Sequence, residues 1–188
     1  MMKKILWCAA VLTAVILTGC WKTPQRKRVD SICNLKRIYL AAESYRMNHN
    51  DECPPDLNTL FKCHTERGDE GDIFISPSDP LSRAVAKDDM REENTSYAYV
   101  GKGVNTRGGD LPIAFEKANI VSATGYCCVL YCDGHVKVVQ MTAKSNREIA
   151  EKLTAHIAPG FAVYAQKNLI IANAAEVDAR EAKVANRK

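Results

Sequence analysis

Metal-binding and disulfide-forming residue types gather around the strongest turn signal of the sequence, the dipeptide Asp133-Gly134. They are Cys127, Cys128, Cys132 and His135. Thiolate and imidazole are ligands that zinc prefers, so Cys128, Cys132 and His135, expected on one hairpin face, form a weak candidate metal site. Along an extended strand, however, Cys128 and Cys132 would lie about 13 Å apart, too far for one ion without a bulge. Disulfide formation by these cysteines is therefore the main prediction, and metal binding is the alternative.

Another cysteine, Cys20, ends an apolar stretch at the N-terminus. Lys3 and Lys4 precede the apolar residues 5–17, and Leu17-Thr18-Gly19-Cys20 closes the run. A basic start with a short apolar segment is typical of a secretory signal and too short for a comfortable membrane span. The closing residues resemble the lipobox of bacterial lipoproteins. That resemblance implies lipid on the Cys20 thiol, with acyl chains such as palmitate, and cleavage before this residue. The alternative is an ordinary signal peptide in which Cys20 is incidental.

The remaining composition narrows the class of protein. Removal of residues 1–19 leaves about 170 residues, enough for one domain with its own core and an appendage. Net charge is +4 at pH 7 for the whole chain, and no basic stripe with interleaved aromatic residues appears, so we expect no nucleic-acid partner. An even number of cysteines in an exported chain favours disulfides. The candidates are Cys33, Cys53, Cys63, Cys127, Cys128 and Cys132. Their pairing stays open, with partners for Cys128 and Cys132 expected among the first three.

Helical periodicity dominates the first part of the mature chain. Asp30 or Ser31 can cap a helix that runs to about residue 48, with apolar positions at helical spacing on one face. A thinner second stripe consists of Cys33, Leu40 and Met47, which we expect a C-terminal helix to cover. Asp56 can cap a short helix from Leu57 to about Cys63, and residues 64–94 are expected to form a long irregular loop.

Strand signals follow at Ser96–Val100, Pro112–Lys117, Tyr126–Cys132 and His135–Val139. Asp133-Gly134 predicts a two-residue hairpin turn with positive φ at both positions. That pairing places Cys127, Val129, Tyr131, Val136 and Val138 on the core face and Cys128, Leu130, Cys132, His135 and Lys137 on the other. Ser145 and Glu148 then form a capping box that opens a C-terminal helical region.

The order of these elements predicts an α+β fold with a long N-terminal helix packed on a small antiparallel sheet, helices on one face, and a C-terminal helical extension. The expected divisions are a signal peptide (1–19), a basic tether (20–29), the α+β domain (30–142) and the extension (143–188).

Four segments in this order resemble type IV pilins and type II secretion pseudopilins, and most closely the prepilin-type "H-X9-DG" proteins. They are Asn34–Ile38 with Ala41, Ala42 and Tyr45; Asn50–Leu57; Ser76–Pro80 with Ser96–Gly101; and Val129–Val136. The resemblance covers roughly residues 31–140 and implies a pilin-like domain.

The departures from that family concern assembly. Ala123 stands where the namesake histidine would lie, and Ser76 replaces a usual cysteine. A prepilin cleavage site and the long apolar helix that builds pilin filaments are both missing from the sequence. The resemblance therefore implies a pilin-like body carried on a lipid anchor.

We expect no enzymatic activity, because no nucleophile lies at a spacing that pairs it with a base. Acidic residues at 69–72 and 88–89 offer oxygen ligands, but their spacing matches no EF-hand loop, so calcium is unsupported and no cofactor is expected. The leading hypothesis is a non-enzymatic lipoprotein of the bacterial cell envelope, periplasmic or surface-exposed. Its pseudopilin-like domain would bind an envelope protein and no small-molecule substrate, as an accessory to a type II secretion or type IV pilus-like system. The alternative is a thiol-redox or metal-binding envelope protein that uses Cys127, Cys128, Cys132 and His135.

Overall fold

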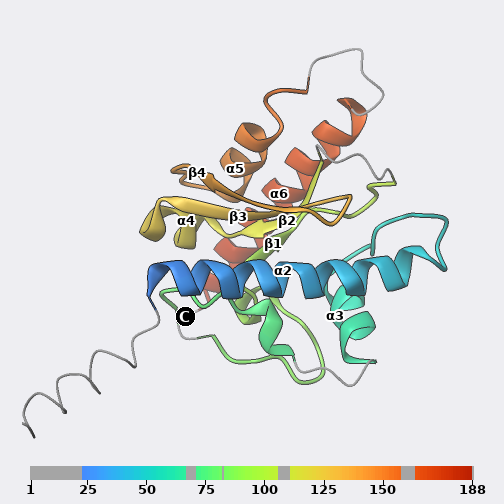
Figure 1. Cartoon of the computed structure of the whole chain (residues 1–188), viewed down its shortest axis with the longest axis horizontal. Coiled ribbons are helices and arrows are strands. Elements are labelled where there is room, and N and C mark those ends of the chain that lie inside the picture. The colour runs from blue at the N-terminus through green and yellow to red at the C-terminus, as the bar shows by residue number, and fades with distance from the viewer. Residues whose placement is uncertain (1–22, 67–70, 82, 106–110, 158–163, 188) are drawn as a thin grey trace, which may run out of the picture.

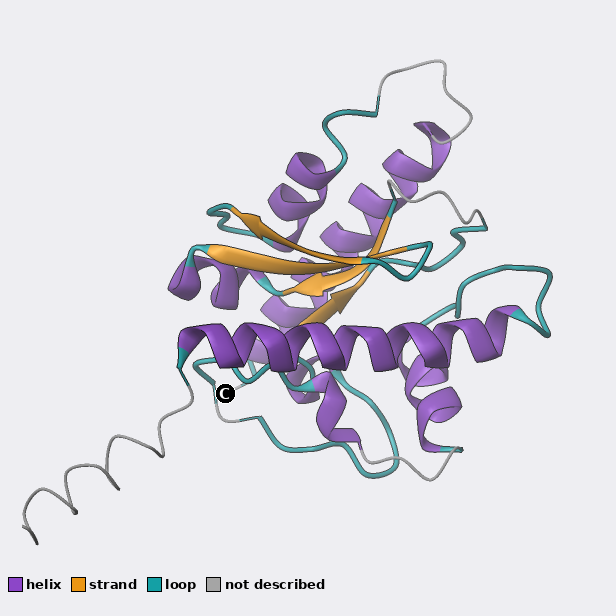
Figure 2. Ribbon diagram, viewed as in Figure 1, coloured by secondary structure: helices purple, strands orange, loops and turns teal. Residues whose placement is uncertain are grey.

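One antiparallel sheet with the strand order β1-β2-β3-β4 forms the centre of the protein, flanked by helices (Figures 1 and 2). The computed structural model describes residues 23–66, 71–81, 83–105, 111–157 and 164–187. In chain order the elements are α2 (Pro24–Arg46), α3 (Leu57–Thr65), η1 (Gly71–Phe74), η2 (Glu92–Asn94), β1 (Tyr97–Tyr99), β2 (Pro112–Glu116), α4 (Ala118–Thr124), β3 (Tyr126–Tyr131), β4 (Val136–Gln140), α5 (Asn146–Leu153) and α6 (Tyr164–Ala185). The predicted α+β class is confirmed.

Helix α2 begins earlier than predicted. Thr23 is its N-cap, with the side-chain oxygen accepting a hydrogen bond from the Arg26 amide at 3.3 Å, and Pro24 occupies the first helical position. Proline is favoured there because its missing N–H would have no partner within the helix. Residues 24–29 of the predicted basic tether (20–29) are therefore part of α2. Asp30 and Ser31, the two predicted caps, both lie within the helix, and Ser31 is buried.

Helices cover both faces of the sheet, not one as predicted. Adjacent residues of an extended chain point to opposite sides. Glu116 accepts a hydrogen bond from Ser31 of α2, whereas the next residue, Lys117, forms an ion pair with Glu181 of α6. Helices α2 and α6 therefore lie on opposite faces, with buried residues of both in one core.

This arrangement leaves the second apolar stripe of α2 uncovered. Leu40 is 52% exposed, Met47 is 78% exposed, and Cys33 is also exposed. The expected cover by a C-terminal helix is wrong, because α6 packs on β1, α5 and η2 across the sheet.

The register of the β3–β4 hairpin differs from the prediction by one residue. Leu130 pairs with Val136, and the Tyr131 amide donates to the His135 carbonyl at 3.0 Å, which leaves a three-residue loop of Cys132, Asp133 and Gly134. Of the two expected turn residues only Gly134 has a positive φ, +84°, as in three-residue loops that end in a left-handed residue. A Cβ added at Gly134 would also lie 2.5 Å from the Tyr39 ring.

A one-residue shift exchanges the two faces of a strand relative to its partner. Val136 and Val138 therefore share a face with Cys128 and Leu130, and not with Cys127 as predicted. All of Cys127–Tyr131 is buried because helices lie on both sides, while Val138 on the edge strand is 39% exposed.

Local capping signals identified two other helices correctly. Asp56 accepts from the Thr59 amide at 2.7 Å to begin α3, and Ser145 accepts from the Glu148 amide at 3.1 Å to begin α5. Helix α4 was not predicted, although Gly125 in the left-handed conformation ends it (φ +72°) in the usual manner of a C-terminal glycine. The predicted loop at 64–94 holds the two 3-10 turns, and Ile73 and Phe74 are fully buried.

Candidate functional site

The proposed lipid attachment residue, Cys20, lies outside the described residues, as does the apolar stretch before it. The described chain starts at the cap of α2, so only three residues separate Cys20 from the first helical residue, Pro24. Among the helices in the described ranges, none combines the length and apolar character that crossing a membrane requires.

Both ends of the described chain lie at one end of the sheet. Ser31, near the start of α2, and Glu181, near the end of α6, bind the neighbouring residues Glu116 and Lys117, and the C-terminus is drawn close to the start of α2 (Figure 1). Exposed basic side chains at this end are Arg26 of α2, Lys183 of α6 and Arg187, which follows α6. Arg28, by contrast, lies over the Tyr126 ring with its guanidinium carbon 3.6 Å from the ring centroid.

At the opposite end of α2 lie two buried cysteines. Cys53 follows the turn after α2 and Cys132 begins the hairpin loop. Arg46 donates to the carbonyls of Asp51 in that turn and of Cys132 in that loop. The Cys132 thiol, as donor, holds the pKa of Cys53 below its usual value, and the nearby Arg46 guanidinium acts in the same direction. Both cysteines are unbonded, so the predicted pairing of Cys132 stays a prediction.

The other predicted cysteine candidates are not brought together. All six cysteines of the described chain are unbonded, with Cys33 exposed and Cys63 half-buried. Burial, followed by the nearby Glu116 carboxylate, raises the pKa of both Cys127 and Cys128. These two thiols are therefore protonated and shielded at neutral pH.

The candidate metal set of Cys128, Cys132 and His135 does not share a face. His135 stacks on Tyr131 with ring centroids 4.4 Å apart, and strand alternation places Tyr131 on the face opposite to Cys128. Across the described ranges, no group of three His, Cys, Asp or Glu residues is placed to hold a metal ion. Of the acidic segment at 69–72, residues 69 and 70 lie outside the described residues.

A buried carboxylate between α2 and the sheet was not singled out by its sequence position. Glu116 Oε1 accepts hydrogen bonds from Ser31 Oγ at 2.9 Å and Ser76 Oγ at 2.7 Å, and Oε2 accepts from the Cys128 amide at 2.9 Å. Ser76, the residue that departs from the family's cysteine, is thus one of its donors. Glu116 is 3% exposed, and these three donors meet the hydrogen-bonding needs of its buried carboxylate. The cluster therefore joins α2, the long loop and the two strands β2 and β3.

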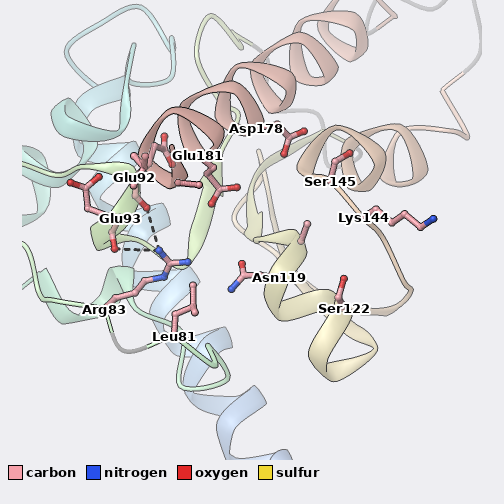
Figure 3. Close-up of a pocket in the computed structure, with 13 residues that line it drawn as sticks. Leu81, Arg83, Glu92, Glu93, Asn119, Ser122, Lys144, Ser145, Asp178 and Glu181 are labelled. Carbon is pink, nitrogen blue, oxygen red and sulfur yellow. Dashed lines mark hydrogen bonds between the residues drawn. The ribbon is translucent and has the colours of Figure 1, made fainter. Parts of the chain in front are cut away.

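A cleft of about 690 Å³ lies on the α6 side, between α4, the start of α5, the end of α6 and the loop around η2 (Figure 3). Two of its acidic side chains, Asp178 and Glu181, are engaged by neighbouring residues. Asp178 accepts from the amides of Asn146 and Arg147, and Glu181 binds Lys117 and the Asn146 amide group. These side chains hold α6 against α5 and the sheet, which gives the cleft a structural role.

Lys117 is the buried cation of this region. Its Nζ lies 3.0 Å from carboxylate oxygens of both Glu92 and Glu181, and the lysine side chain is fully buried. Arg180 forms a further ion pair with Glu92 at 3.2 Å. Sequence reasoning missed this group because its partners lie far from Lys117 along the chain.

The Lys117→Ala variant is expected to lose about 2 kcal/mol of unfolding free energy, measured by urea denaturation. A charge left without its partner is costly, but Glu92 and Glu181 are partly exposed and regain some hydration. The control is Lys102→Ala, because Lys102 pairs with Glu176 at 3.5 Å with both side chains about half exposed; it should lose well under about 1 kcal/mol. Equal losses in both variants would contradict a special role for the buried pair.

No protein-family model matches the chain, and neither a curated protein nor a solved structure matches it. The fold itself places the protein among α+β domains, with helices covering both faces of the sheet.

Proposed function

We propose that the protein is a non-enzymatic, lipid-anchored lipoprotein of the bacterial cell envelope whose pseudopilin-like domain binds another envelope protein. The observation that carries the proposal is the ending Leu17-Thr18-Gly19-Cys20 after a basic and apolar leader, directly before the capped start of α2. The partner class that the family resemblance suggests is a component of a type II secretion or type IV pilus-like system.

The positions of the termini support this arrangement. An anchor at Cys20 would hold the start of α2 close to the membrane, with the end of α6 beside it. Exposed Arg26, Lys183 and Arg187 would then face anionic headgroups, which attract basic residues near the membrane surface. The turn after α2 and the β3–β4 hairpin, at the other end, would point away from the bilayer.

The outer face of α2 offers a surface for protein contact. Val29, Leu40 and Met47 are exposed on it at helical spacing, with Cys33 between them. Exposed apolar side chains that cluster on one face are typical of interaction sites. Pilin-like subunits bring long apolar helices to their contacts, so an apolar helix of such a component is the partner we propose for this face.

Affinity purification from detergent-solubilised envelopes tests the partner. Mass spectrometry should identify a secretion or pilus component with a prepilin-type apolar helix among the recovered proteins, and Leu40→Glu should reduce its recovery at least tenfold. Leu81→Glu is the matched control, because Leu81 is 55% exposed but lines the cleft on the α6 side and is not on the outer face of α2. Recovery of no such component, or equal loss in both variants, would remove the assembly part of the proposal.

The alternative function through Cys127, Cys128, Cys132 and His135 has less support. The three thiols are buried, their pKa values are raised, and His135 lies on the other face of the hairpin from Cys128. Redox chemistry needs an accessible thiolate, so these residues do not form a reactive set.

A further inference from the structure

Strand β4 forms one edge of the sheet (Figure 1), and its outer side carries backbone groups that the sheet does not use. In an antiparallel pair, alternate residues direct both their N–H and their C=O to the neighbouring strand. The Tyr131 amide donates to the His135 carbonyl at 3.0 Å. At the other end of β4, the Met141 amide donates to the Gly125 carbonyl at 3.1 Å, so odd-numbered residues face β3. The backbone groups that point outward are those of Val136, Val138 and Gln140.

The outward backbone groups of β4 are open to a further strand. Among the described residues, no backbone hydrogen bond from outside the sheet reaches them. Val138 is 39% exposed and Gln140 is also exposed, although both side chains point to the face on which α2 packs. Helix α2 therefore does not extend over the outer side of β4 at these positions. Open backbone groups beside an exposed β-branched side chain are what an added strand needs.

The opposite edge of the sheet, at β1, is closed. The outward amide of Tyr97 donates to the Thr95 hydroxyl at 3.1 Å, and α6 packs against the strand. Folded proteins commonly protect sheet edges with a proline, a bulge, a charge or a covering segment. Across its described length, β4 holds no proline and pairs with β3 without a bulge. Its one charged side chain, Lys137, has the ammonium 5.2 Å from the Tyr131 ring centroid, over β3. This difference between the two edges favours a strand partner for β4.

From this edge we propose that two copies of the protein pair antiparallel through β4 and form one continuous sheet across a two-fold axis at Val138. Val138 lies opposite Val138 of the second copy, and Val136 lies opposite its Gln140. Two-fold contacts are the commonest in soluble homo-oligomers, because one self-complementary surface serves both subunits. The proposal depends on neither the lipid anchor nor the partner of α2.

Charge and strand alternation select this register. The outward residues of each opposed pair exchange both N–H···O bonds, and Lys137 lies opposite Val139 of the second copy. An axis moved to Lys137 would set two ammonium groups directly opposite each other, which is destabilising. An axis moved to Val139 would leave Val136 without a partner inside the strand. Because opposed residues share a face of the joined sheet, α2 of both copies lies on one side and α6 of both on the other.

The test places charges at the two-fold axis of the full-length protein extracted in detergent. Tagged and untagged copies are co-expressed, and recovery of the untagged copy on the tag is measured by immunoblotting. The unmodified copies should be recovered together. Val138→Lys on both copies, or Val138→Glu on both, should lower recovery at least tenfold, because like charges meet at the axis. Val138→Lys mixed with Val138→Glu should restore recovery to near that of the unmodified pair.

Val85→Lys on both copies is the matched control, because Val85 is 45% exposed and lies outside β4. It should leave recovery unchanged. Thermal unfolding by circular dichroism should show that both Val138 variants stay folded, since this side chain is partly exposed already.

Hydrogen exchange of the unmodified chain decides the question even where a variant fails to fold. The outward amides of β4 are bonded only in the pair, so the peptide that holds them should exchange about tenfold more slowly at high protein concentration than at low. Absence of the untagged copy from the unmodified pair, equal recovery of the like-charged and opposite-charged pairs, or exchange that does not depend on concentration would overturn the proposal.

Discussion

Replacing Cys20 with serine is expected to abolish the mature, acylated form of the protein and to accumulate a precursor that begins at Met1. A serine hydroxyl does not receive the diacylglycerol that the lipobox resemblance implies, and cleavage before residue 20 follows that transfer. A single acyl chain gives only marginal membrane binding, whereas two or more hold a protein firmly, at about 0.8 kcal/mol for each buried CH₂. Intact mass of the membrane-extracted protein reports both cleavage and acylation.

Cys8→Ser is the control for that experiment, because Cys8 lies inside the apolar leader and leaves with it. It should be processed like the unmodified chain. In addition, a chain that starts at Trp21 behind an ordinary signal peptide should appear in the soluble fraction. An unmodified protein that begins at Met1, or one that begins at residue 20 without acyl chains, would refute the anchor.

Glu116→Ala is expected to produce the largest loss of stability, about 4 kcal/mol of unfolding free energy. The substitution removes a buried acceptor of three hydrogen bonds, leaves the hydroxyls of Ser31 and Ser76 and the Cys128 amide without it, and opens a cavity. For a chain of this size that loss lowers the melting temperature by about 10 °C. Urea denaturation and thermal unfolding by circular dichroism measure both quantities.

Two further variants separate the causes. Glu116→Gln keeps the side-chain volume, but its NH₂ group would face groups that also donate hydrogen bonds. We therefore expect an intermediate loss of about 2 kcal/mol in unfolding free energy. Glu52→Ala removes an exposed carboxylate and should change stability by less than about 0.5 kcal/mol. A Glu116→Ala protein as stable as the Glu52→Ala protein would show that the buried cluster contributes nothing.

Features that depend on neighbouring residues could be predicted from the sequence. Asp56 and Ser145 marked the starts of their helices because a capping side chain bonds an amide only three residues away. The four strands were also predicted close to their observed bounds, in a sheet predicted to be antiparallel. Helix α2 starts before the predicted cap at Asp30 or Ser31, because Thr23 caps it and Pro24 fits its first position. The lipobox is likewise a local pattern, and its function stays a prediction.

Features that depend on distant partners became visible only in the folded protein. The hairpin register changed by one residue because a three-residue loop with only Gly134 left-handed closes it, and that shift exchanged the faces of β4. Glu116 and Lys117 are tolerated in the interior because donors and carboxylates from remote segments meet them there. Arg46 bonds the carbonyls of both Asp51 and Cys132, a contact that spacing along the chain does not encode. Helix caps and strands follow from short-range sterics and hydrogen bonds. Contacts between distant residues follow from packing, which must give every buried charged or polar group a partner.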